Sequence, residues 1–337
     1  MIKIDSVFEG RGQTQLKRHV EAYFQVAVPD RIEQIKRTIF DPSKSLAERK
    51  EAYRSNQKTI GLLKPLFKKI KKAHIQLAKD QGFGNYLEFV LKRNGISGRK
   101  FDLFLKNVDV AIEDINKNLP FPRDIPDWYW SEFNIPDVLY YFKEDFQLNI
   151  PGDVFEKLEK YFPEFGKFKK RIKIKKITDV APNAKFNKED KTVTLEISLS
   201  QGLFNAFVFV HELGHAISFI KLADEGIDPY SKSKYWHEKN ADKFKFEFAN
   251  KSFPEEVKYA TRGEILNEFI STFFEYNIYS DPDQDFDKAY ARAINRCFPG
   301  KPRQVNNPFY VLEKGFIFRP LSTLCASVAQ LELLVKE

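Results

Sequence analysis

The chain has 337 residues, enough for about two domains or one large one. Apolar residues make up 42% and charged residues 30% of the sequence, a balance that excludes disordered and fibrous classes and is typical of a folded soluble protein. The formal net charge of +8 is a mild positive excess, which by itself does not indicate a nucleic-acid partner.

Nothing in the sequence predicts a secreted or membrane protein. Cys297 and Cys325 are too few for a disulfide framework in a chain of this length, which favours a reducing compartment. The first ten residues lack the basic and apolar segments of a secretory signal. The longest apolar stretch, 202–220, contains three ionisable side chains, so we interpret it as a buried helix and not as a membrane span. We expect a cytoplasmic location.

The first half of the chain has helical periodicity. Apolar residues at three- and four-residue steps predict a helix over 60–77, where Pro65 marks a start or a kink. A short helix follows within 85–95, with a capping arrangement at its start and Gly95 at its end. A third apolar stripe predicts a helix over 101–119.

The period changes to two after Arg171. Residues 172–175 and 192–197 each alternate apolar with polar side chains, which predicts strands with one face in water. The sequence NKEDK between them, 187–191, is a plausible turn. We therefore expect a small sheet immediately before the apolar helix of 202–220.

The strongest chemical signal is the sequence HELGH at residues 211–215. On a helix, His211 and His215 share one face and can offer two imidazole nitrogens to a metal ion, with Glu212 beside them near a metal-bound water. The alternative is a surface helix with two unrelated histidines. The apolar residues on both sides of the motif argue against it, because buried histidines and a buried glutamate need partners.

A third ligand is predicted in the sequence TRGEILNEFISTFFEYN, residues 261–277. Thr261 and Glu264 resemble a capping box that starts a helix, and Glu264, Glu268 and Glu275 then fall on one stripe among apolar residues. Carboxylates on such a helix need neutralisation, so we expect Glu268 to bind the metal. For Glu264, a solvated edge or a pair with a lysine is an equal alternative.

The sequence resembles the thimet oligopeptidase and oligoendopeptidase F family of zinc peptidases. In that family a HExxH helix precedes a helix of pattern Glu-x-x-Ser-x-x-x-Glu, matched here by Glu268, Ser271 and Glu275. The stretches LAKDQGFGNYLEFVLKRNGIS and APNAKFNKEDKTVTLEISLSQGLFNAFVFVHELGHA are also similar to family segments. The likeness is clear over 180–276 and weak over 45–337.

The resemblance implies a mainly α fold of the gluzincin type, with a small β-sheet beside the active-site helix. Residues 1–165 would form a helical N-terminal lobe and residues 166–337 the zinc catalytic region, both around one cleft. It further implies one zinc ion bound by His211, His215 and Glu268. Glu212 would be the general base and proton shuttle, and Glu275 would support the ligands from behind.

Three features depart from the family. The chain is shorter than family members, and the segment 216–267 between the two motif helices is longer than in oligoendopeptidase F. The family's C-terminal histidine is missing, because no histidine follows His237. Tyr310 is the candidate oxyanion donor in its place, although a tyrosine in an aromatic-rich segment also fits plain packing. His237 and Tyr235, both in the longer segment, are candidate substrate contacts.

We therefore predict a zinc-dependent metallopeptidase that hydrolyses short peptides, with no nucleic-acid or membrane partner and an open oligomeric state. The alternative is a catalytically silent relative that retains zinc and binds peptides or regulates. A second alternative is a basic nucleic-acid-binding protein with a structural zinc, suggested by the lysine-rich stretch 166–176. The strand-like alternation of that stretch explains the same lysines as the wet face of a sheet.

Overall fold

The structure is a computed structural model in which the chain forms two compact units. The first comprises Met1–Arg93, Pro122–Asp137 and Asn267–Leu324, and the second Asn94–Phe121, Val138–Leu266 and Cys325–Glu337. Each unit gathers three separate segments, whereas the predicted lobes followed the sequence order. The structure describes residues 11–26, 34–35, 38–39, 44–119, 150–177, 182–197, 203–281, 283–299, 309–312, 316, 320–321 and 323–334.

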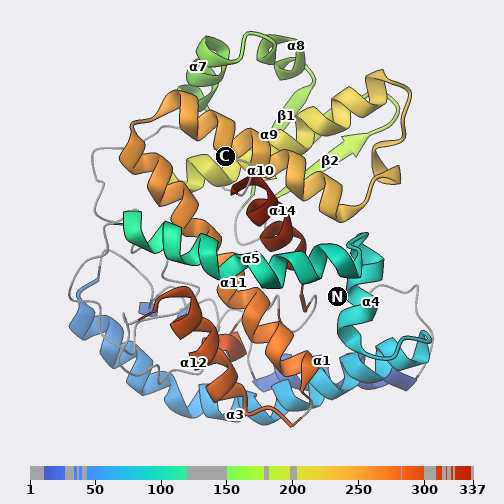
Figure 1. Ribbon diagram of the computed structural model, residues 1–337, viewed down its shortest axis with the longest axis vertical. Coiled ribbons are helices and arrows are strands. Elements are labelled where there is room, and N and C mark those ends of the chain that lie inside the picture. Colours follow the sequence, from blue (N-terminus) through green and yellow to red (C-terminus); the bar gives the residue numbers. More distant parts are fainter. Residues whose placement is uncertain are drawn as a thin grey trace. The chain divides into compact units, whose positions relative to one another are not determined.

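The first unit is helical where the structure describes it (Figure 1). Its elements are α1 (Arg11–Val26), α3 (Leu46–Asp80), α4 (Tyr86–Asn94, which ends at the unit boundary), the later part of α11 (Glu255–Ser280), α12 (Phe286–Cys297) and the 3₁₀ turn η3 (Phe309–Leu312). The predicted helix over 60–77 is the C-terminal half of α3, which packs against α1. It continues through Pro65, because a long buried face outweighs the one lost backbone hydrogen bond.

The second unit contains the sheet and most of the remaining helices. These are α5 (Gly98–Asn118), α7 (Gly152–Tyr161), α8 (Phe165–Lys169), α9 (Leu203–Asp224), the 3₁₀ turn η2 (Pro229–Ser231), α10 (Lys234–Ser252), the first turns of α11 and most of α14 (Leu324–Leu334). The predicted short helix is α4, where Asn85 Oδ1 accepts a hydrogen bond from Glu88 N at 2.8 Å. Gly95 ends it with a φ of +72°, a conformation that favours glycine.

Three strands form the sheet of the second unit, in the order β1-β3-β2. They are β1 (Ile172–Lys176), β2 (Asn183–Asn187) and β3 (Thr192–Ile197); β3 pairs in parallel with β1 and antiparallel with β2. The two predicted strands are confirmed as β1 and β3. The turn at 187–191, however, joins β2 to β3, because β2 lies between the two predicted strands in the sequence.

One face of the sheet is wet, as the alternation predicted. On that face Glu196 accepts Lys175 at 3.0 Å and Lys185 at 2.5 Å, and Lys173 pairs with Asp190 at 2.9 Å. The lysine ends are exposed, so each pair contributes only about 0–1 kcal/mol. The lysines of the strands are thus partnered by carboxylates across the sheet.

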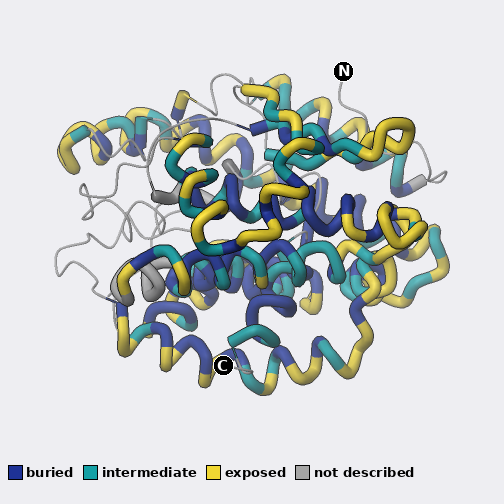
Figure 2. The backbone as a smooth tube through the Cα atoms, turned by 90° about the horizontal axis from the view of Figure 1, so that it is seen from above, coloured by how far each residue is buried: buried dark blue, intermediate teal, exposed yellow. Residues whose placement is uncertain are grey.

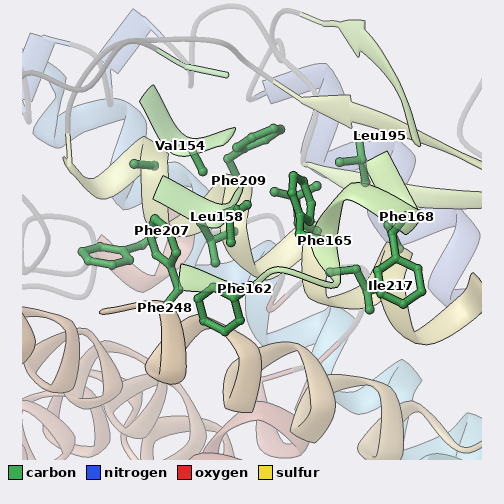
Figure 3. Close-up of a cluster of buried hydrophobic side chains, with 14 of the residues drawn as sticks. Val154, Leu158, Phe162, Phe165, Phe168, Leu195, Phe207, Phe209, Ile217 and Phe248 are labelled. Atoms are coloured by element: carbon green, nitrogen blue, oxygen red, sulfur yellow. The ribbon is translucent and has the colours of Figure 1, made fainter. Parts of the chain in front are cut away.

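The other face of the sheet covers an aromatic core built around α9. Val193, Leu195 and Ile197 of β3 are buried there, and α9 packs on β2 and β3. Figure 3 shows the cluster, in which phenylalanines of α7, α8, α9 and α10 lie together. Helix α9 is long and apolar enough to cross a membrane, but 72% of its window Asn205–Asp224 is buried within the protein. It is the core helix predicted from the sequence.

Most described helices have one buried and one exposed side, which Figure 2 shows as alternating dark and yellow stretches of the tube. The predicted fold class, mainly α with a small sheet beside the HELGH helix, is confirmed.

Candidate metal centre

Helix α9 and helix α10 approach each other closely at Gly214, the glycine of HELGH. A Cβ atom on Gly214 would lie 2.7 Å from the Cα atom and 3.0 Å from the carbonyl oxygen of Ala241. Side chains do not reach such separations, so the contact requires glycine on α9 and a small residue on α10. The close approach brings Glu238 and Asp242, which flank Ala241 on α10, against the histidines of α9.

The side chains of His211, His215 and Glu238 converge on one point. Nε2 of His211 lies 3.1 Å from Nε2 of His215, and Oε2 of Glu238 lies 3.4 Å from the first and 3.8 Å from the second. An ion with tetrahedral bonds of about 2.0–2.1 Å separates its ligand atoms by about 3.4 Å. The three atoms therefore have the spacing of three corners of a zinc site, and among the described residues they are the only such group.

Asp242 fixes the orientation of His211 from behind. Its carboxylate is fully buried, and Oδ1 accepts a hydrogen bond from Nδ1 of His211 at 3.1 Å. Because Nδ1 then has the proton, Nε2 presents a lone pair to the point where the three side chains converge. A carboxylate behind a ligating imidazole also raises the basicity of that ring.

The electrostatics of the cluster favour a cation. Burial works against the charged forms of Glu238 and Asp242, yet neighbouring positive groups keep the pKa of each at about 2. Burial would lower the pKa of His211, but Asp242 and Glu238 raise it to about 10. Burial and the neighbouring His211 lower the pKa of His215 to about 4. Two buried carboxylates thus face two imidazoles, and a metal ion would satisfy all of them.

Glu212 is partly buried on α9 between the two histidines. Burial raises the pKa of its carboxyl to about 7; the Glu238 carboxylate adds to the shift and His211 opposes it. A carboxyl group with a pKa near neutrality can both take up and release a proton under physiological conditions. This property suits the role of general base predicted from HELGH.

The carboxylate beside the histidines is Glu238, whereas the sequence pointed to Glu268. Glu268 belongs to the first unit, beyond the boundary that crosses α11, and lies outside the three-residue cluster. Glu275, also in the first unit, is buried and accepts the backbone N–H of Leu321 at 2.7 Å. Glu264 lies 3.7 Å from Lys245, which is the lysine pairing given as its alternative. The expected helix start at Thr261 is wrong, because α11 begins six residues earlier.

His237 and Tyr235 lie at the start of α10, beside the cluster. The ring of His237 is 6.5 Å from that of His215, and its Nε2 donates to the carbonyl of Pro229 at 2.9 Å. Tyr235 is buried, with the ammonium of Lys100 over its ring at 4.1 Å. The structure thus places His237 near the metal cluster and gives Tyr235 a packing environment. Substrate contact by either remains a prediction.

Tyr310 lies in the aromatic core of the first unit. Its ring contacts those of Phe67 and Phe274 at 5.3 and 4.9 Å, and its hydroxyl donates to Asp287 at 2.9 Å. The hydroxyl considered as an oxyanion donor is therefore engaged by a carboxylate. Of the two sequence-based interpretations of Tyr310, the structure favours packing.

Sequence reasoning missed Glu238 and Asp242 because it treated 216–267 as an insertion. The signal was available in the sequence HEKNAD, residues 237–242: the two carboxylates are four residues apart, on one face of a helix. What the sequence did not show is that this face meets HELGH, since that depends on the packing at Gly214.

The amino-acid sequence matches no protein-family model and no curated protein sequence. The fold, by contrast, is similar to that of solved peptidases. An oligoendopeptidase F matches 95% of this chain with a TM-score of 0.64 at 13% identity. PZ peptidase A, solved with an inhibitor, matches 95% with a TM-score of 0.61 at 12% identity. A peptidase from Chlamydophila abortus matches 94% with a TM-score of 0.53 at 12% identity.

The chain spans 65% of the length of the first two structures and 61% of the third. The predicted resemblance to the oligoendopeptidase F group is confirmed at the level of the fold.

Proposed function

We propose that this protein is a zinc-dependent metallopeptidase that hydrolyses short peptides. One observation supports this most strongly: Nε2 of His211, Nε2 of His215 and Oε2 of Glu238 lie 3.1–3.8 Å from one another, the spacing of a tetrahedral zinc site. Catalytic zinc sites have three protein ligands and leave the fourth position open for water or substrate. The fold shared with solved peptidases favours a peptide as the substrate.

In this proposal the zinc ligands are His211, His215 and Glu238, and Glu238 replaces Glu268 in the ligand set. Bound zinc supplies a Lewis acid that polarises the scissile carbonyl and lowers the pKa of water. Asp242 holds the imidazole of His211 in the tautomer that a metal ligand needs. Glu238 and Asp242 neutralise the ion's charge within a buried site.

Glu212 transfers the proton. It follows the first ligand in HELGH and is not part of the cluster, so its carboxylate is free to accept a proton from the attacking water. The protonated carboxyl then gives that proton to the nitrogen of the leaving amine as the peptide bond breaks. Burial keeps the pKa of the carboxyl near the pH at which both transfers are feasible.

The activity is tested with the zinc-loaded protein and a library of quenched fluorescent peptides. We expect cleavage by the parent and its loss in Glu212→Gln, which keeps the size of the side chain but removes the base. Both proteins are compared at equal, measured zinc content. Absence of cleavage by both, with zinc bound, would favour the catalytically silent alternative, which the engagement of Tyr310 by Asp287 also favours.

The ligand set is tested separately by zinc affinity. We expect Glu238→Gln to weaken zinc binding by at least tenfold, since it removes the one carboxylate among the three donors to the ion. Glu268→Gln, a matched change on α11, should leave the zinc Kd within a factor of about two. The reverse result would reinstate the ligand set predicted from the sequence.

A further inference from the structure

A lysine is buried behind the candidate metal centre. Lys245 lies on α10 with only 7% of its surface exposed. Its ammonium is 3.3 Å from Oδ1 of Asp242 and 3.7 Å from Oε2 of Glu264, which lies on the part of α11 that belongs to the same unit. A buried lysine is costly unless it is paired, so the fold retains this charge against two carboxylates.

Lys245 and His211 share one oxygen of Asp242. Oδ1 accepts from Nδ1 of His211 at 3.1 Å and lies 3.3 Å from the ammonium of Lys245. The other oxygen, Oδ2, is buried and has no hydrogen-bond partner among the described residues. The orientation of this carboxylate therefore depends on the two groups that contact Oδ1, and Lys245 is the one that does not bind the metal.

We propose that Lys245 is a positioning residue of the metal centre: it holds the Asp242 carboxylate in the orientation that fixes the His211 imidazole. Glu264 balances the second half of the lysine's surroundings and keeps its ammonium in place. A row of four charged or polar groups thus runs from Glu264 through Lys245 and Asp242 to His211. This inference rests on the proposed function, because it assigns Lys245 a role toward the same zinc ligand.

The sign of the effect on zinc affinity separates positioning from simple electrostatics. A positive charge close to a cation site repels the cation, so removing that charge would by itself tighten zinc binding. If Lys245 positions Asp242, its removal frees the carboxylate to turn, His211 loses its fixed tautomer, and zinc binding weakens. Loss of a group behind a metal ligand typically weakens binding by about 10- to 100-fold.

The experiment measures the zinc Kd of the full-length protein by competition with a chromophoric chelator. We expect Lys245→Met to raise the Kd about tenfold, and Lys245→Arg to restore part of the loss. The matched control is Lys243→Met on the same helix, whose side chain is 63% exposed and pairs with Glu247. It should leave the Kd unchanged.

A double variant tests the route of the effect. If Lys245 acts through Asp242, then Lys245→Met combined with Asp242→Asn should bind zinc no more weakly than Asp242→Asn alone. In the cobalt-loaded protein, Lys245→Met should also change the visible ligand-field absorption, which Lys243→Met should not. A general loss of stability would add to the effect of Asp242→Asn and would leave that spectrum unchanged.

Wild-type or tighter zinc binding by Lys245→Met would overturn the proposal, and so would full additivity with Asp242→Asn. If Lys245→Met does not fold, Glu264→Gln provides the same test, because it releases the ammonium while keeping its charge; an unchanged Kd would then count against the role. Failure of the metal site itself is recognised separately, since Glu238→Gln would then leave zinc binding intact.

Discussion

The contact at Gly214 provides the sharpest test of how the site is assembled. In Gly214→Ala, the new Cβ would meet the Cα atom of Ala241 at 2.7 Å, whereas ordinary contacts begin at 3.4 Å. The obstructing atoms are backbone, so no side chain can rotate away, and helix α10 must retreat by about 0.7 Å or tilt. Such overpacking usually destabilises a protein by about 1–3 kcal/mol.

The consequence for the metal is larger than the consequence for stability. Metal–ligand distances tolerate errors of about 0.2 Å, and a shift of α10 moves both Glu238 and Asp242 relative to the histidines by several times that amount. We therefore expect Gly214→Ala to weaken zinc binding by at least tenfold, while the free energy of unfolding of the metal-free protein falls by about 1–3 kcal/mol. Chelator competition measures the first quantity and urea unfolding the second.

Gly61→Ala is the control for this experiment. Gly61 lies within α3, and a methyl group added to its Cα atom would have no neighbour within 4 Å. Alanine there should stabilise the protein by about 0.5–1 kcal/mol and leave zinc binding unchanged. Wild-type zinc affinity in Gly214→Ala would refute the reasoning, because it would mean that the position of α10 does not determine the ligand geometry.

Two further predictions concern the first unit. Tyr310→Phe should reduce the free energy of unfolding by about 0.5–1.5 kcal/mol through loss of the hydrogen bond to Asp287, and should leave kcat within about twofold; a 100-fold or greater fall in kcat would restore the oxyanion role. Burial lowers the pKa of His74 to about 3, so the unfolded chain binds a proton below about pH 6.5 that the folded chain does not. Stability should therefore fall by about 1.4 kcal/mol per pH unit between pH 6 and 4, and urea unfolding of His74→Gln should show a shallower slope.

The elements that could be predicted from the sequence are those whose signals are local. The helix around HELGH follows from a long apolar stretch, and β1 and β3 follow from strict alternation next to a wet lysine face. The start of α11 was misplaced because Thr261 and Glu264 match a capping box inside a helix that had already begun. Pro65 likewise neither starts nor ends α3, since tertiary packing of its buried face outweighs the local preference.

The candidate site was half predictable for the same reason. His211, Glu212 and His215 lie within one turn and a half, so their relation is fixed by helix geometry alone. The third carboxylate depends on which helix packs against that turn. Glu268 had the better local pattern, but Glu238 lies on the helix that meets Gly214, and no rule of periodicity ranks two such helices.

Helix α10 supplies every group that completes the metal centre outside HELGH. Glu238, Asp242 and Lys245 are spaced at i, i+4 and i+7, so they form one stripe, and along it their distance from the metal position increases in steps: a ligand, the carboxylate behind a ligand, and the ammonium behind that carboxylate. Because all three share one helix, a rigid displacement of α10 alters them together, whereas a single substitution alters one. Zinc affinity should therefore be lost more completely in Gly214→Ala, which moves the whole stripe, than in Lys245→Met, which removes only its last member.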